Sequence, residues 1–281
     1  MSSLSGDSGL SRILRFFVCA IMVLVIAVPL YISIMGGLKS MGQLRAEPIN
    51  LPHPFLWDQY AKMLSGKLGF FWRELSNSLV VGLGTVAVVL VVGTFAGYAL
   101  ARLRFRLNAL LYGYFQLGLL FPLAVAILPL YLQLRGLHLL NTRIGVILPQ
   151  AAFGLAMMIM LLRGFFKAIP NELEEAAAMD GYGTFGFLFR IVVPLSTPIL
   201  ATVSVLSLVA SWNNFFTPLL VLNSQKRFTL PLGVMDFMGE HAADWNMILA
   251  FLTLAMVPAV LIYVLCQRYI VAGLAAGAIK G

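Results

Sequence analysis

The chain has 281 residues, of which 60% are hydrophobic and 11% are charged, and its formal net charge is +8. Charged residues make up about 25% of an ordinary soluble domain, so this composition excludes a soluble protein and indicates an integral membrane protein. Basic residues beside membrane segments explain the positive charge, so no nucleic-acid partner is expected.

Several apolar stretches are long enough to cross a hydrocarbon core of about 30 Å as helices. They predict an all-α polytopic membrane protein with six transmembrane helices, because they do not alternate in the manner of barrel strands. We place the spans near residues 13–37, 75–101, 108–133, 144–163, 197–222 and 246–268. Residues 1–281 are therefore expected to form a single transmembrane domain.

The first span follows Arg12 and Arg15 and has some features of a secretory signal. Its length of about twenty residues and the lack of a small-residue cleavage site favour a span that is not removed. Arginines also crowd the short loop at 102–106, between the second and third spans. Cytoplasmic loops are enriched in Lys and Arg, so this loop and both termini are expected on the cytoplasmic side.

The longest stretch between apolar blocks that is built to fold outside the membrane lies within a loop at 165–196. Asn171 is expected to cap a helix of about nine residues, and Asp180 followed by Gly181 is expected to end it. Thr184 is expected to cap a second helix, which Pro194 must end or bend. An amphipathic connector on the membrane surface is the plainer alternative for such a loop.

Polar groups at membrane depth are few, and none of them is an Asp, Glu, Lys or Arg away from the ends of the spans. Amides beside aromatic rings can bind the hydroxyls and apolar faces of a sugar, and Pro218 can bend the fifth span at its amides. The alternative is that the amides bond neighbouring helices. The candidate pathway residues are Gln116, Trp212, Asn213 and Asn214.

Other chemistry is not supported by the sequence. It has no G-x-x-x-x-G-K-[ST] phosphate loop, so the chain is not expected to hydrolyse ATP. The glycines at 181, 183 and 186 match G-x-G-x-x-G formally, but they follow a helix rather than a strand, which excludes a dinucleotide site. No catalytic or metal site is expected. The acidic residues and histidine of one outer loop match no standard ligand pattern: Asp236, Glu240, His241 and Asp244.

Within the loop at 165–196, one set of residues resembles the EAA loop of the membrane subunits of ATP-binding-cassette importers, with its spacing kept across about twenty residues. This set is Glu175, Ala176, Ala177, Asp180, Gly181, Ile191 and Pro194. Further segments resemble the maltose-type membrane subunit of carbohydrate importers: Tyr98 to Arg102, Pro129 to Leu132, Leu162 to Phe166, Trp212 with Asn213, Leu230 to Gly233 and the end from Gln267 to Gly281.

The resemblance implies one membrane subunit of a heteromeric importer in the inner membrane of a bacterial cell. It implies a second related membrane subunit, two cytosolic ATPase subunits and an extracytoplasmic solute-binding protein as partners. ATP and Mg²⁺ would be bound by the ATPase, and this chain would hold no cofactor. The EAA residues would dock in the ATPase, and the solute would be a sugar.

Three alternatives stay open in the sequence. The solute could be a polyol or a glycerol phosphodiester carried by the same mechanism. An ion-coupled carrier acting alone is disfavoured, because such carriers generally keep ionisable groups or broken helices within the membrane. A membrane enzyme is least supported, because no catalytic constellation can be assembled.

Overall fold

The computed structural model describes residues 9–66, 70–238 and 243–278, and for residues 9–11 and 268–278 it describes the backbone alone. Glu240, His241 and the last three residues of the chain lie outside these ranges. The chain divides into two compact units, one of residues 1–71 and 234–257 and one of residues 72–233 and 258–281. The regular elements of the described residues are helices, with no strand among them.

Four helical segments in the described part of the chain are long and apolar enough to cross a membrane: residues 12–36, 71–102, 143–168 and 245–267. Two bent helix pairs bring the number to six if each pair is one span. The fold class predicted from the sequence is confirmed: the chain is an all-α polytopic membrane protein. Six spans in a single domain stay a prediction.

The first unit contains α1 (Gly9–Gly36), α2 (Met41–Ala46), α3 (Asp58–Leu64) and the first part of α13 (Trp245–Ala278). Lys39 is fully buried there, and its Nζ donates to the carbonyls of Glu47 at 2.6 Å and Pro48 at 3.0 Å. Gln59 donates to the carbonyl of Lys39. These bonds join the segment after α1 to α3.

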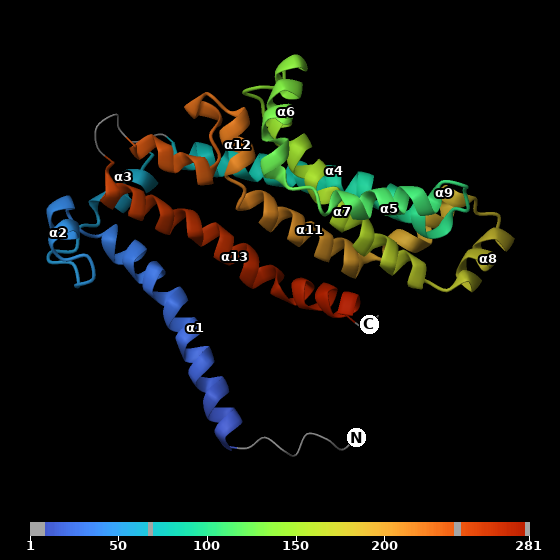
Figure 1. Ribbon diagram of the computed structural model, residues 1–281, viewed down its shortest axis with the longest axis horizontal. Coiled ribbons are helices and arrows are strands. Elements are labelled where there is room, and N and C mark those ends of the chain that lie inside the picture. The colour runs from blue at the N-terminus through green and yellow to red at the C-terminus, as the bar shows by residue number, and fades with distance from the viewer. Residues whose placement is uncertain (1–8, 67–69, 239–242, 279–281) are drawn as a thin grey trace. The chain divides into compact units, whose positions relative to one another are not determined.

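The second unit is built on three long helices, α4 (Phe71–Arg102), α7 (Arg143–Ala168) and α11 (Thr197–Trp212). The shorter helices of this unit are α5 (Asn108–Gly118), α6 (Leu123–Gly136), α8 (Asn171–Met179), α9 (Thr184–Phe187), α10 (Val193–Leu195) and α12 (Phe216–Val221). A π-helical turn, Leu188–Val192, joins α9 to α10, and 3₁₀ turns follow α12 at Gln225–Arg227 and Leu230–Phe237. α8 lies past the C-terminal end of α7 (Figure 1).

Glycines let α4 pack closely on its neighbours. A Cβ on Gly97 would come within 3.0 Å of Leu162 Cβ and 3.3 Å of a backbone nitrogen of α7. A Cβ on Gly84 would meet Ile147 at 2.6 Å, and one on Gly82 would meet Leu208 at 2.9 Å. Small residues of this kind allow membrane helices to approach without steric conflict.

Two of the stretches expected to be spans contain breaks. Residues 108–136 form α5 and α6, and the chain bends by 103° between these two helices. The stretch expected at 197–222 forms α11, which ends at Trp212, and α12, which begins at Phe216. The second break falls at the amides, where Pro218 was expected to bend the helix, because proline removes one helical hydrogen bond and crowds the preceding turn.

Candidate functional site

The helix α8 has the length and the end that the sequence predicted. It runs over nine residues from Asn171 to Met179. Gly181 then takes a φ of 82°, a conformation that glycine adopts at little cost. The N–H of Gly181 donates to Ala178 at 3.0 Å, and that of Tyr182 donates to Ala177 at 2.9 Å. These bonds satisfy carbonyls of the last turn and fix the exit of the chain.

Two predicted helix caps are wrong. The residue that caps α8 is Pro170, without a side-chain bond, because the Oδ1 of Asn171 accepts a hydrogen bond from Arg102 instead. The residue that caps α9 is Gly183, and Thr184 is the first residue of that helix. At α8, Arg102 takes the side-chain oxygen that was expected to cap the helix. At α9, the cap lies one residue earlier than expected, so the side-chain bond that the sequence favoured is absent.

One face of α8 packs on the rest of the second unit. Ala177 is 2% exposed and belongs to a buried apolar cluster with Phe166, Ile169 and Leu188. Tyr182 packs against the same cluster, and Arg190 lies over its ring at 5.0 Å. The small side chain of Ala177 lets the backbone of α8 approach the end of α7. The helix is therefore fixed to the membrane helices by its own core contacts.

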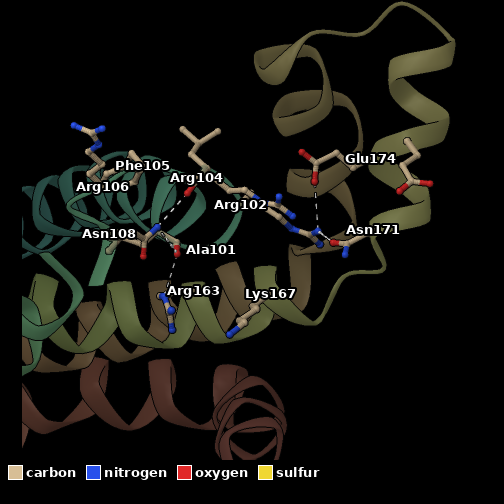
Figure 2. Close-up of a pocket in the computed structure, with 13 residues that line it drawn as sticks. Ala101, Arg102, Arg104, Phe105, Arg106, Asn108, Arg163, Lys167, Asn171 and Glu174 are labelled. Atoms are coloured by element: carbon tan, nitrogen blue, oxygen red, sulfur yellow. Dashed lines mark hydrogen bonds and ion pairs between the residues drawn. The ribbon is translucent and has the colours of Figure 1, made fainter. Parts of the chain in front are cut away.

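Arg102 at the end of α4 holds the start of α8, and its side chain is only 4% exposed. Its Nε donates to the carbonyl of Phe166 at 3.0 Å, and one terminal nitrogen donates to the carbonyl of Ile169. The other terminal nitrogen lies 2.7 Å from Asn171 Oδ1 and 3.4 Å from Glu174 Oε2 (Figure 2). A guanidinium suits this site, since it offers five donors in a rigid plane and binds carbonyls at a helix C-terminus.

This link was not predicted from the sequence, which marked Arg102 only for its charge and as part of a motif. The signal available in the sequence was a basic residue at the end of one helix, which can bind the carbonyls at the end of another. Arg163 of α7 makes a parallel link: its Nε donates to the carbonyl of Leu100 at 3.2 Å, and its guanidinium lies 3.8 Å from the ring of Tyr112 in α5. The ends of α4, α5 and α7 are thus joined beside α8.

Apart from Ala177, most of α8 is exposed. Met179 is 89% exposed and Leu173 is 39% exposed, with Ala176 also at the surface. Leu173, Ala176 and Met179 recur at intervals of three residues, which places them on one side of a helix. This apolar face was missed at the sequence level, although its spacing is readable there. A short helix with an exposed apolar face and acidic residues beside it is suited to contact another protein.

The sequence-predicted residues of the loop fall at different depths. Glu175, Ala176, Asp180 and Gly181 are exposed, whereas Ala177 is buried. Ile191 lies in the π-helical turn and packs against the buried cluster. Pro194 is exposed in α10, and the chain bends by 76° between the helical run 184–195 and α11. Five of the seven residues thus lie at or just after the C-terminal end of α8. The other two lie in the segment that leads to α11.

A cavity of about 1090 Å³ lies beside α8 and is lined from α4, the loop after it, α7 and α8 itself. Its cationic residues are Arg102, Arg104, Arg106, Arg163 and Lys167 (Figure 2). Glu174 and Glu175 line the same space. Clustering of basic residues at the ends of spanning helices is the pattern of a cytoplasmic surface.

The candidate pathway residues are not gathered in one place. Trp212 and Asn213 line a cavity of about 270 Å³ with Val209 and with Tyr263 of α13. Asn214 lines a separate cavity, and its Oδ1 accepts from the N–H of Thr217 at 3.0 Å. Gln116 is exposed on α5. The Nδ2 of Asn213 donates to the carbonyl of Val209 at 3.1 Å within its own helix, whereas the alternative expected bonds to neighbouring helices.

The fold and the site define a class of protein: a polytopic helical membrane protein that presents a short, firmly attached helix between two of its spanning segments. The chain belongs to the family of binding-protein-dependent transport system inner membrane components, whose model matches residues 89–275. The family resemblance expected from the loop is thereby confirmed. As a member, the chain is the membrane component of an importer and not its ATPase.

Curated relatives match along almost the whole chain. The sulfoquinovosyl glycerol transport system permease protein SmoH of Agrobacterium fabrum is 34% identical over 288 aligned positions, which cover 100% of each chain. The arabinooligosaccharides transport system permease protein AraQ of Bacillus subtilis is 32% identical over 256 residues, which cover 90% of each chain. A crystal structure of a bacterial ABC transporter involved in the import of the acidic polysaccharide alginate has a chain with a TM-score of 0.81, 22% identity and coverage of 96% and 99%. This likeness shows the fold.

Proposed function

We propose that this chain is the permease subunit of an ATP-driven carbohydrate importer and that α8 is the element that docks in a cytosolic ATPase. The observation that carries the proposal is the two-sided character of α8. Ala177 is buried against the spanning helices, while Leu173, Ala176 and Met179 are exposed and open to a partner. A helix fixed on one side and exposed on the other can pass a displacement of the partner to the membrane helices.

The proposed mechanism uses the links at the ends of α4 and α7. Arg102 ties the end of α4 to carbonyls at the end of α7, those of Phe166 and Ile169, and to the first turn of α8. When ATP closes the ATPase dimer, α8 moves with its docking site, and α4 and α7 move with α8. ATP shifts the equilibrium between the two arrangements through the differential contacts that the ATPase makes with each.

The proposed assembly follows from this mechanism. The chain forms half of the pathway, and a second related permease subunit forms the other half. Two ATPase subunits, which bind ATP and Mg²⁺, lie on the cytoplasmic side, and an extracytoplasmic binding protein delivers the solute. The chain crosses the membrane six times as one domain, with both termini in the cytoplasm. The arginines beside α8 support this orientation, since basic residues favour the cytoplasmic side.

The proposed solute is a sugar. The names of AraQ and of other relatives describe transport of arabinooligosaccharides, starch degradation products and diacetylchitobiose. The second candidate is a polyol or a glycerol phosphodiester, and the name of SmoH, which describes sulfoquinovosyl glycerol, supports it only through the glycerol part. The uncharged amides of the pathway suit a neutral polyhydroxylated solute. Gln116, Trp212, Asn213 and Asn214 are proposed as pathway residues on that ground.

The experiment that tests the proposal is gentle solubilisation of the native membrane followed by purification of the tagged chain and identification of what co-purifies. The expected partners are one further permease subunit and two copies of an ATPase for each copy of this chain. The complex is then placed in vesicles with its binding protein and screened for uptake of labelled neutral sugars and glycerol glycosides. Recovery of the chain alone, active without ATP, would instead favour an ion-coupled carrier.

A further inference from the structure

A second cavity lies among α4, α7 and α11, within the second unit. Its volume is about 180 Å³, well above the roughly 15 Å³ that one water needs. Its polar lining consists of Thr85, Gln150, Ser207, Ser211 and Asn214, and its apolar lining consists of Val89, Phe153, Gly154, Met158 and Ala210. None of these described lining residues is charged.

Gln150 stands at the centre of the polar lining. It is 9% exposed, and its Oε1 accepts from the hydroxyl of Ser211 at 2.5 Å and from that of Thr85 at 3.3 Å. Its Nε2 is buried and has no hydrogen-bond partner among the described residues. Turning the amide would only exchange the two ends, because hydroxyls can donate or accept. One half of this amide is left unpaired in either orientation.

Ser207 lies one helical turn before Ser211 on α11, and its side chain has the same property. It is 5% exposed, and its hydroxyl is buried without a hydrogen-bond partner in the described structure. The preceding serine of the same helix, Ser204, instead donates to the carbonyl of Leu200 at 2.8 Å within the helix. Buried polar groups are nearly always hydrogen-bonded, and an unpaired one calls for a water or a ligand. Two such groups on one small cavity indicate a site that receives one.

The position of the cavity suits a transported solute. Gln150 lies seven residues after the start of α7, which is about 10 Å along the helix axis. In the orientation proposed above, that is on the outer side of the membrane centre. Asn214 connects the cavity to the break between α11 and α12. Phe153 at its rim is 38% exposed, so an aromatic face stands beside the unpaired donors.

We propose that this cavity is a hydrogen-bonding subsite for a hydroxyl group of the transported sugar, with Gln150 and Ser207 as its binding residues. The proposal rests on the proposed function and adds the place where this chain contacts its solute. The donors and acceptors are neutral groups, which a hydroxyl can match as both donor and acceptor, and Phe153 supplies an apolar surface for the ring. Ligand sites commonly combine an apolar wall with a few fixed polar groups.

The test uses the full complex in vesicles with its binding protein and ATP. The substrate is the sugar that the unaltered importer takes up fastest, compared with its monodeoxy analogues. The variants are Ser207→Ala and Gln150→Leu, and the matched control is Ser204→Ala, whose hydroxyl is bonded within its own helix. Co-purification of the partner subunits measures assembly of each variant. The binding protein is the same throughout, so a change in the preference for the sugar over an analogue belongs to this chain.

The unaltered complex is expected to prefer the sugar over one particular deoxy analogue. Ser207→Ala or Gln150→Leu is expected to reduce that preference about three- to tenfold, the loss of one net hydrogen bond, while Ser204→Ala keeps it. A purely structural or water-filled cluster would lower the uptake of sugar and analogues equally, or change nothing, and either result overturns the subsite. Absence of sugar uptake by the unaltered complex refutes the proposed function and the subsite together, so the two failures are distinguishable.

Discussion

Replacement of Gly181 by valine tests the attachment of α8 most sharply. The φ of Gly181 is 82°, and no atom lies within 4 Å of the position of its absent Cβ. The valine side chain therefore meets open space, and its whole effect is on the backbone. A left-handed conformation costs an ordinary residue about 1–2 kcal/mol, and a β-branched residue is a genuine outlier there.

If the backbone relaxes to avoid this cost, it breaks the two bonds that end α8, those from the N–H groups of Gly181 and Tyr182. Each bond contributes about 1 kcal/mol. The variant is thus expected to destabilise the native exit from α8 by roughly 2 kcal/mol, a shift of about thirtyfold in population. Uptake should fall strongly, and ATP hydrolysis should lose its stimulation by the loaded binding protein.

Gly183→Val is the matched control. Gly183 also has open space at its Cβ, but its φ is −78°, which any residue adopts. Uptake and stimulated ATP hydrolysis are measured for both variants at equal amounts of inserted chain. Full transport by Gly181→Val, or an equal loss in Gly183→Val, would refute the reasoning that the left-handed turn after α8 is needed for coupling.

Three further changes probe the same region and its support. Arg102→Ala removes the bonds to the end of α7 and the start of α8 and is expected to lower the free energy of unfolding by an amount on the order of 2 kcal/mol. Arg104 is exposed, and Arg104→Ala should change it by less than about 0.5 kcal/mol. Equal melting temperatures of the two variants would contradict this. Met179→Asp is expected to reduce ATPase co-purification with little change in stability. Leu137 directly follows α6 and is also exposed, and Leu137→Asp should leave co-purification unchanged. Gly97→Val is expected to cost about 1–3 kcal/mol by overpacking, and Gly113→Val, with open space at its Cβ, should not.

The sequence predicted the parts of the structure that depend on local chemistry and on apolar length. The nine-residue helix α8 and its end at Gly181 follow from the alanines and the glycine, which act within a few residues. The close packing of α4 follows from its glycines in the same way. The family followed from the spacing of the EAA residues, and the match to the family model confirms it.

Features that depend on distant residues could not be predicted in this way. Asn171 has the right chemistry for a helix cap, but Arg102, 69 positions earlier, takes its oxygen. The break between α5 and α6 follows Gly118 and contains Pro122, but these residues do not indicate how far the chain bends there, which is 103°. The pairing of Gln150 with Thr85 and Ser211 joins three helices and required the fold.

The most direct test of the central claim, that α8 is the contact with the ATPase, is site-specific cross-linking in the native membrane. Cys19 and Cys266 are first replaced by alanine, and Met179→Cys and Leu137→Cys are then introduced separately into the chain. We expect Met179→Cys, but not Leu137→Cys, to cross-link to the ATPase subunit with a short bifunctional reagent, and ATP to change the yield. Absence of a cross-link from Met179→Cys in an assembled, transporting complex would contradict docking through α8.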